Sequence, residues 1–200
     1  RPMPTPDPWD DDATLARLGL VRDAGGAPRI PVPPVANIAA DTVGRHARGL
    51  RAQAPALIVD HGDRVETWSF AALDEAATRL AAGLRAIGVA EGVPVAVHTG
   101  QSVATALGHL ALYKLGAVVM TLSQLYGPET VRHAMADSGA EFVLTDAQAW
   151  AAVAEGVAAL PQRVVPILAD PDAGSIPEGG LALAGLLATD PADFEPVRTN

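Results

Sequence analysis

The chain contains no cysteine, which excludes disulfide bridges, thiolate metal sites and a cysteine nucleophile. Aromatic side chains make up only 4% of the 200 residues, so the hydrophobic 49% must build its core from alanine, valine and leucine. No basic segment leads into an apolar run of signal-peptide length, and no run reaches the roughly 18 apolar residues of a membrane helix. We therefore expect a soluble protein, with the cytoplasm as its default compartment.

Positive charge is also scarce. Lysine and arginine number 14 against 23 acidic residues, which gives a formal net charge of -9. A surface of this sign repels phosphate backbones and anionic lipids, so neither nucleic acid nor a membrane is expected as a partner. The bias toward alanine, and toward arginine over lysine, is typical of a GC-rich bacterial genome. The first residue is Arg1 rather than Met, which indicates a trimmed or engineered terminus.

The first 36 residues differ from the rest of the chain. Proline recurs in residues 2–8 and 31–34, and it interrupts helices and central strands. Between these clusters, residues 13–20 can form a short helix capped by an aspartate of the run Asp10-Asp11-Asp12. Such a run can also be read as a metal site, but at a chain end a solvated cap is far more common. The sequence predicts an irregular arm, residues 1–36, wrapped on the body.

A regular pattern begins at residue 37. It predicts a helix over 38–50 and a short hairpin with strands 56–59 and 65–68 around the turn His61-Gly62-Asp63. Ser69 is a suitable N-cap for the next helix, because apolar residues then recur every three or four positions until Gly88. Four strands follow near Val93, Ala117, Glu141 and Arg163, with helices beginning near Ser102, Pro128 and Ala147 between them.

Alternating strands and helices predict an α/β fold with a parallel, Rossmann-like sheet and right-handed crossovers. The body is assigned to residues 37–170. Residues 171–200 are predicted to be a linker with one short helix around 181–187.

The segment 111–130 combines a helix end, a strand and a second helix start. Gly116 stands where a left-handed C-cap is needed, and Lys114 lies in the last turn, near the negative end of the helix dipole. Residues 118–122 form an apolar strand, and Pro128 suits the first position of the following helix. The carboxyl edge of such a sheet is where open α/β folds bind ligands.

Several catalytic motifs are absent from the sequence. The turn after the first strand of the βα series, residues 98–102, has one glycine instead of the Gly-x-Gly-x-x-Gly of dinucleotide-binding folds. There is no phosphate-loop motif and no Gly-x-Ser-x-Gly elbow, which argues against a phosphate-loop ATPase and an α/β-hydrolase.

Single titratable residues give weaker signals. The five histidines show no metal-ligand spacing, and His98, the one placed at a strand end, is better explained by the core or the turn. Glu129 and Asp146 are explained as helix-terminal residues, whereas Asp137 is an acid-base candidate by residue type alone. No metal site and no catalytic residue is therefore assigned.

Taken together, five blocks of sequence resemble the N-terminal part of an acyl-CoA synthetase of the adenylate-forming superfamily. ETWSFAALDEAATRLA is similar to the first core motif of that family and YKLGAVVMTLS to the second, with NIAADTVGRHAR, PALIVD and DSGAEFVLTD in the same order around them. The resemblance covers residues 37–170. It implies ATP-dependent activation of a carboxylic acid to an acyl-adenylate, followed by acyl transfer to coenzyme A.

The resemblance also implies that this chain is incomplete. The phosphate loop, the nucleotide motifs and the catalytic lysine of the family lie further along, so Lys114 is not that lysine and the chain alone is expected to be inactive. ATP, Mg²⁺ and coenzyme A are then cofactors of the full-length enzyme, with none bound tightly here. The family places the loop after the second-motif strand near the coenzyme A channel, which here corresponds to Ser123, Gln124, Leu125 and Tyr126; a simple packed turn is the alternative interpretation.

Three readings remain open for the acid, which can be acetate, a medium-chain acid or an aromatic acid. For the chain itself, the alternatives are a non-catalytic binding or assembly module with a Rossmann-like fold and a half-structure that self-associates through an exposed apolar patch.

Overall fold

A computed structural model describes residues 11–31, 33–170 and 176–199 of the chain. They divide into two compact units, one ending at Val35 and the other comprising Ala36–Thr199. Residues 1–10, with the first proline cluster and Asp10, and the whole PDAG stretch at 171–174 lie outside the described residues.

The first unit contains a short helix and a small hairpin. In α1 (Asp12–Arg17), the Asp11 carboxylate accepts hydrogen bonds from the amides of Ala13 and Thr14, both at 3.1 Å, which confirms the predicted aspartate cap. The two-residue strands β1 (Val21–Arg22) and β2 (Pro28–Arg29) pair antiparallel and were not predicted, because so short a strand has no periodicity to detect.

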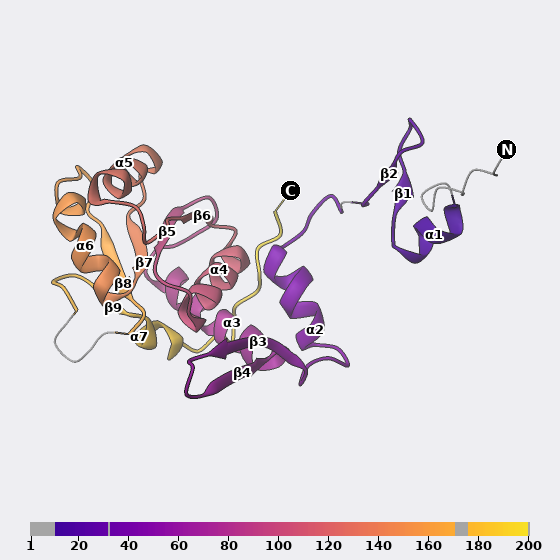
Figure 1. Cartoon of the computed structure of the whole chain (residues 1–200), viewed down its shortest axis with the longest axis horizontal. Coiled ribbons are helices and arrows are strands. Elements are labelled where there is room, and N and C mark those ends of the chain that lie inside the picture. Colours follow the sequence, from indigo (N-terminus) through magenta and orange to yellow (C-terminus); the bar gives the residue numbers. More distant parts are fainter. Residues whose placement is uncertain (1–10, 32, 171–175, 200) are drawn as a thin grey trace. The chain divides into compact units, whose positions relative to one another are not determined.

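A five-stranded parallel sheet forms the centre of the second unit (Figure 1). Its strands lie in the order β6-β5-β7-β8-β9, and every neighbouring pair is parallel. The predicted α/β class with βα units is therefore confirmed. The strands are β5 (Pro94–His98), β6 (Val118–Thr121), β7 (Phe142–Thr145), β8 (Val165–Leu168) and β9 (Leu181–Ala182).

The predicted helices occupy both faces of this sheet. They are α3 (Phe70–Ala86), α4 (Val103–Leu115), α5 (Pro128–Ser138), α6 (Ala147–Ala158) and α7 (Leu183–Leu187). Ser69 caps α3 through a bond from the amide of Ala72, and Gly116 ends α4 with a φ of 68°, both as predicted. At a positive φ the Cβ atom of any other residue lies too close to the backbone, which explains why glycine stands at that helix end.

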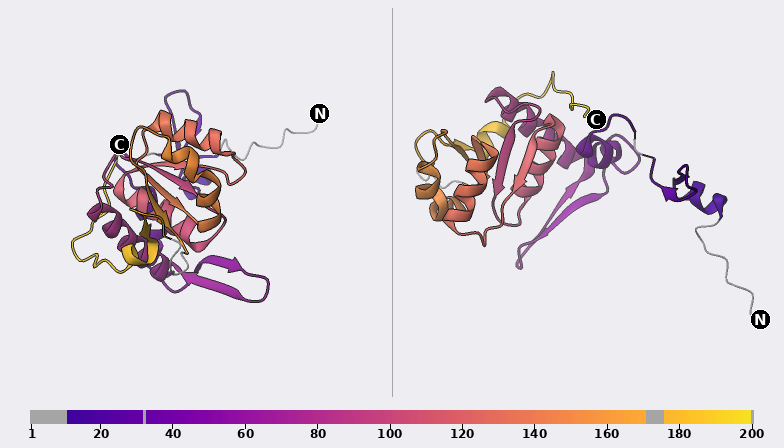
Figure 2. Two further views of the ribbon diagram at one scale, coloured as in Figure 1. Left: turned by 90° about the vertical axis from the view of Figure 1, so that its left-hand side faces the viewer. Right: turned by 90° about the horizontal axis from the view of Figure 1, so that it is seen from above.

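Two hydrophobic cores lie on opposite faces of the sheet. Figure 2 shows the sheet lying between two layers of helices. Along β5, Val95 and Val97 enter the core under α3, α4 and α7, whereas Ala96 enters the core under α5 and α6. This alternation follows from the two-residue period of a strand and explains why buried parallel strands are apolar throughout.

The segment before α3 departs in one detail from the prediction. Helical residues run from 38 to 47 rather than to 50, and they include a π-helical stretch, η1 (Ala40–Gly44), followed by α2 (Arg45–Ala47). The hairpin is confirmed, with β3 (Pro55–Asp60) and β4 (Val65–Ser69) pairing antiparallel. Three residues of the hairpin, Ala56, Leu57 and Trp68, contact the core under α3.

The C-terminal segment contributes more than the predicted linker and helix. Residues 181–182 form β9, the fifth strand, before α7 begins at Leu183. Phe194 is buried in the core, and Thr199 forms a β-bridge with Ala36. Gly83 makes the close approach of α7 to α3 possible, because a Cβ there would lie 2.5 Å from the carbonyl oxygen of Leu186. Within the described residues, no helix combines the length and the apolar character that crossing a bilayer requires.

Candidate functional site

Three loops meet at the carboxyl edge of the sheet. They follow β5 (Thr99 and Gly100), β6 (residues 122–127) and β7 (Asp146). The strand order reverses at β5, because the chain passes from β5 to β6 on one side and then to β7 on the other. Open α/β sheets bind their ligands in the crevice at such a reversal, which makes this edge the candidate site.

Asp146 connects these loops. Its Oδ2 atom accepts three hydrogen bonds, from the Thr99 hydroxyl at 3.0 Å, the Gly100 amide at 3.1 Å and the Gln124 side-chain amide at 2.8 Å. Its Oδ1 atom accepts the amide of Ala149 at 2.7 Å and caps α6, which confirms the predicted cap. One carboxylate therefore joins the loop after β5, the loop after β6 and the start of α6.

These hydrogen bonds decide the ionisation of Asp146. Its partial burial raises the pKa of the carboxyl, but the amides of Ala149 and Gly100 and the hydroxyl of Thr99 donate to the ionised form and outweigh that effect. The net result is a pKa below the ordinary value for aspartate. Asp146 is therefore a carboxylate at neutral pH and accepts all of its hydrogen bonds.

The four predicted site residues lie together along one cavity of about 500 Å³. Ser123 Oγ accepts the amide of Leu125 at 3.1 Å, and the Tyr126 amide donates to the Ser123 carbonyl at 3.0 Å, so residues 123–126 form a tight turn. The side chain of Leu125 is 95% exposed and that of Tyr126 is 46% exposed. The turn therefore presents two large apolar side chains that are only partly covered.

A second and larger cavity, of about 790 Å³, adjoins the first. It extends toward the hairpin residues His61, Glu66 and Trp68 and toward α7. Both cavities are lined by the same four residues of the carboxyl edge, Thr99, Gly100, Gln101 and Gln124. The hydrogen bond from Gln124 to Asp146 thus lies at their common border.

His98 lies next to this site without entering it. Its ring is 1% exposed, and within the described residues neither ring nitrogen has a hydrogen-bond partner. Burial lowers the pKa of His98, and the charge of Asp146 opposes that effect only in part. The ring is therefore neutral near pH 7 and belongs to the core, one of the two roles expected from the sequence.

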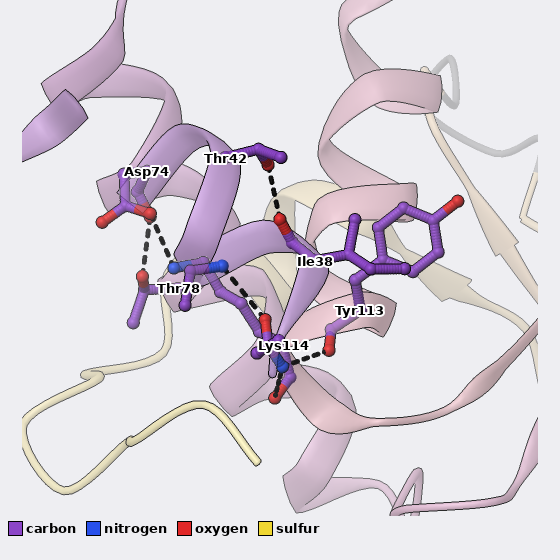
Figure 3. Close-up of polar contacts among 8 residues, drawn as sticks. Ile38, Thr42, Asp74, Thr78, Tyr113 and Lys114 are labelled. Atoms are coloured by element: carbon purple, nitrogen blue, oxygen red, sulfur yellow. Dashed lines mark hydrogen bonds and ion pairs between the residues drawn. The ribbon is translucent and has the colours of Figure 1, made fainter. Parts of the chain in front are cut away.

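Lys114 lies away from the carboxyl edge, at the end of α4 (Figure 3). It is 2% exposed, and its Nζ atom donates to the Asp74 carboxylate on α3 at 2.7 Å. Asn37 reaches the same helix end and donates to the carbonyls of Tyr113 at 2.6 Å and Val197 at 2.7 Å. These contacts join four parts of the fold, which are α3, α4, the segment at Asn37 and the C-terminal segment at Val197. No local pattern in the sequence indicates that Lys114 has a buried partner 40 residues earlier.

The family to which the chain belongs follows from a comparison with family models. Residues 44–189 match the model described as "AMP-binding enzyme", and they include the three loops of the carboxyl edge. The chain belongs to the AMP-binding enzyme family. This confirms the resemblance to adenylate-forming enzymes.

Two known proteins are similar to limited parts of this chain. The 4-coumarate--CoA ligase 5 of Oryza sativa subsp. japonica is 40% identical over 91 residues, which is 46% of this chain and 17% of that ligase. Chondramide synthase cmdD of Chondromyces crocatus is 32% identical over 88 residues, 44% of this chain and 2% of the synthase.

Solved structures share the fold. An acyl-CoA synthetase of Brucella canis matches with a TM-score of 0.71 at 23% identity, over 84% of this chain and 30% of its own. The anthranilate CoA ligase AuaEII, solved with anthranoyl-AMP, gives a TM-score of 0.71 at 21% identity over the same shares. A benzoate CoA ligase from Burkholderia xenovorans LB400 gives 0.67 at 22% identity, over 80% and 30%. The chain thus spans less than a third of the length of the proteins that it matches.

Among the described residues, the carboxyl edge lacks the side chains that would hold ATP or Mg²⁺. The described residues that line its two cavities include no arginine or lysine, and the charged ones around the larger cavity are acidic apart from His61. A triphosphate needs cations or clustered donors, so ATP does not fit this edge. Nowhere in the described part of the chain do three histidine, aspartate or glutamate residues gather as metal ligands, so Mg²⁺ has no cluster here either.

Proposed function

We propose that this chain is the N-terminal part of an ATP-dependent acyl-CoA synthetase, which activates a carboxylic acid through an acyl-adenylate and transfers the acyl group to coenzyme A. The observation that carries this proposal is the family match over residues 44–189, together with the fold shared with CoA ligases. The acid is acetate, a medium-chain acid or an aromatic acid, and the compartment is the cytoplasm of a bacterium.

Within such an enzyme, the chain serves as scaffold and as one wall of the coenzyme A channel. We assign this wall to Ser123, Gln124, Leu125 and Tyr126, whose cavity offers apolar surface from Leu125 and Tyr126 and amide groups from Gln124. That mixture suits the neutral, amide-containing arm of coenzyme A, which supplies the thiol that receives the acyl group. The absence of arginine and lysine among the lining residues means that the phosphates of coenzyme A and of ATP are held elsewhere. The same reasoning assigns Mg²⁺ to other parts of the enzyme.

The chain by itself is proposed to be inactive in adenylation. Stabilising the charge that develops on the phosphates requires preorganised donors or cations, and the carboxyl edge directs its donors to Asp146 instead.

Carboxylate-dependent exchange between ATP and pyrophosphate tests the proposal. The assay is run on the full open reading frame that contains this chain and on the 200 residues alone, with short, medium-chain and aromatic acids. Exchange by the full protein with silence from the 200 residues supports the proposal and identifies the acid. Silence from both overturns the ligase function.

A second candidate is a half-structure that associates with itself through an exposed apolar patch, and one observation favours it. Ile58 on β3 and Val65 on β4 are 62% and 64% exposed, so the hairpin presents apolar side chains to solvent. Light scattering of the 200 residues at several concentrations tests this: a concentration-dependent dimer supports the self-associating half-structure, and a monomer throughout argues against it.

A further inference from the structure

We propose that Asp146 and Gln124 are positioning residues for the loop after β6, and that their hydrogen bond sets the access of coenzyme A to the site. This inference rests on the proposed function and adds to it the residues that hold the loop in place. The set Thr99, Gly100, Gln124 and Asp146 is called the Asp146 cluster below.

The loop has few other attachments. Within the described residues, the hydrogen bonds of residues 123–127 otherwise stay inside the turn or lead into α5, which the loop itself begins. Among the residues that the structure describes, the bond from Gln124 to Asp146 is the polar contact that joins the loop to another element of the sheet edge. Leu122, the first residue of the loop, is held to β5 by its backbone amide, which donates to the Val97 carbonyl. Losing the Gln124 contact therefore frees the turn but leaves β6 in place.

The fit of Gln124 supports a fixed position rather than an occasional contact. Its side-chain amide lies over Gly100, where an added Cβ would approach Gln124 Oε1 to 3.2 Å. The same glycine donates its backbone amide to Asp146. The Gln124 side chain is thus held between a backbone surface without a side chain and a carboxylate that accepts its hydrogen bond.

The shared oxygen makes the arrangement depend on charge. Three donors converge on Asp146 Oδ2, one more than its two lone pairs, and they are held there by the negative charge of an ionised oxygen that carries no proton. A donor at position 124 is therefore attracted to Asp146, and a second carboxylate at that position is repelled. If Gln124 acts through its hydrogen bond to Asp146, the effect of a substitution at position 124 depends on the charge introduced. If Gln124 acts only by packing, the effect does not depend on that charge.

The consequence for the reaction follows from the place of the cluster between the two cavities. When Gln124 leaves Asp146, Leu125 and Tyr126 lose their fixed position along the smaller cavity, and the arm of coenzyme A meets a disordered wall. Adenylation precedes entry of the thiol and uses groups elsewhere, so it is not affected. The expected signature is a raised KM for coenzyme A with unchanged ATP to pyrophosphate exchange.

Three variants at one exposed position test this in the full-length protein. Gln124→Lys keeps a donor opposite Asp146, Gln124→Ala removes it, and Gln124→Glu places a like charge there. Gln53→Ala, an exposed glutamine far from the cluster in sequence and outside both cavities, is the matched control. Because water partly replaces a lost partner at an exposed position, we expect the KM for coenzyme A to rise about fivefold in the alanine variant and further in the glutamate variant. The control variant stays within about twofold of wild type, and the lysine variant, which changes a residue of the channel wall, is compared through the cleavage readout below.

A second readout does not depend on activity. Chymotrypsin cleaves after exposed tyrosine and leucine, so the rate of cleavage after Leu125 and Tyr126 reports the order of the loop. We expect Gln124→Ala to be cleaved faster than wild type and Gln124→Glu to be cleaved faster still. The lysine variant and Gln53→Ala should be cleaved at the wild-type rate. Equal cleavage and equal KM in all variants would overturn the inference, as would an exchange rate that falls in step with thioester formation. If wild-type protein shows no exchange with any acid, the proposed function fails, and the cleavage order alone still decides whether Asp146 positions the loop.

Discussion

Two polar clusters, one at each end of the sheet, each centre on a carboxylate, but they differ in burial. At the helix end of α4, the ion pair of Lys114 and Asp74 has side chains that are 3% and 16% exposed. At the carboxyl edge, Asp146 is half-buried and Gln124 is exposed. A buried ion pair leaves an uncompensated charge when one partner is removed, whereas water replaces a lost partner at an exposed loop. The first cluster therefore secures the fold, and the second adjusts a surface that the fold presents.

The largest effect is expected from Lys114→Met. Removing the ammonium leaves the Asp74 carboxylate without its partner, and breaking a buried pair costs about 3 kcal/mol or more. The free energy of unfolding, measured by urea denaturation, should fall by that amount. The double variant Lys114→Met with Asp74→Leu should recover most of the loss, because a well-packed apolar pair can replace a buried ion pair. A double variant as unstable as the single one would refute this account.

A smaller loss is expected from Asn37→Ala. The side chain donates to the carbonyls of Tyr113 and Val197 and accepts the amide of Ala40 at 3.0 Å. Its loss leaves buried carbonyls without a donor, which costs about 2 kcal/mol. Urea denaturation measures this, and Asn37→Asp should be worse than alanine, since it places a carboxylate against the same carbonyls. An aspartate variant as stable as wild type would contradict the assigned hydrogen bonds.

At the carboxyl edge, Asp146→Ala should cost only about 1 kcal/mol, the ordinary value of a helix N-cap. Asp146→Asn retains a capping side chain and should lie closer to wild type in urea. Its side-chain amide has one acceptor oxygen in place of two, so it cannot satisfy both the cap and the loop donors. A parallel pH series sharpens the contrast, because the pKa of Asp146 is lowered in the folded chain. The ionised carboxylate then contributes to the free energy of unfolding at every pH above the unfolded pKa of aspartate. This contribution is lost as the pH falls through the lowered pKa.

The last prediction concerns the pH dependence that His98 adds. Its pKa is lowered by burial, so the unfolded chain binds a proton more readily than the folded chain. Stability should therefore be highest above about pH 6.5, the ordinary pKa of histidine, and should decline as pH falls below it. In the His98→Leu variant, the free energy of unfolding should fall less steeply between pH 7 and pH 5. The difference between the two slopes is at most about 1.4 kcal/mol per pH unit, the value for one proton. Identical slopes in urea titrations of both proteins would show that the ring is not neutral inside the fold.

Most of the sheet could be predicted from sequence because each strand and helix carries a local signal. The apolar runs before Gly116 and after it, the serine caps and the proline at the start of α5 each specify a boundary. Strand β9 and the burial of Phe194 carry no such signal, since they depend on the sheet already being in place. The segment predicted to be a linker thus contributes to the fold through contacts that local sequence does not encode.

The candidate site shows the same limit. The cap function of Asp146 was predictable from the sequence alone, because a cap bonds to the next turn of its own helix. Its bonds to Thr99, Gly100 and Gln124 depend on β7 lying beside β5, which is a property of strand order. Residues 123–126 were assigned through family resemblance, and their proximity to Asp146 became apparent only in three dimensions. Lys114 is a similar case, because its partner Asp74 lies on another helix.

The burial of Lys114 has a practical consequence, because it is the single lysine of the chain. Reagents that acylate amines act on the deprotonated, accessible form, and Nζ here is an ion-paired ammonium under α3 and α4. Acylation of Lys114 then requires the helices to separate, so its rate provides a covalent, site-specific clock for opening of this part of the fold.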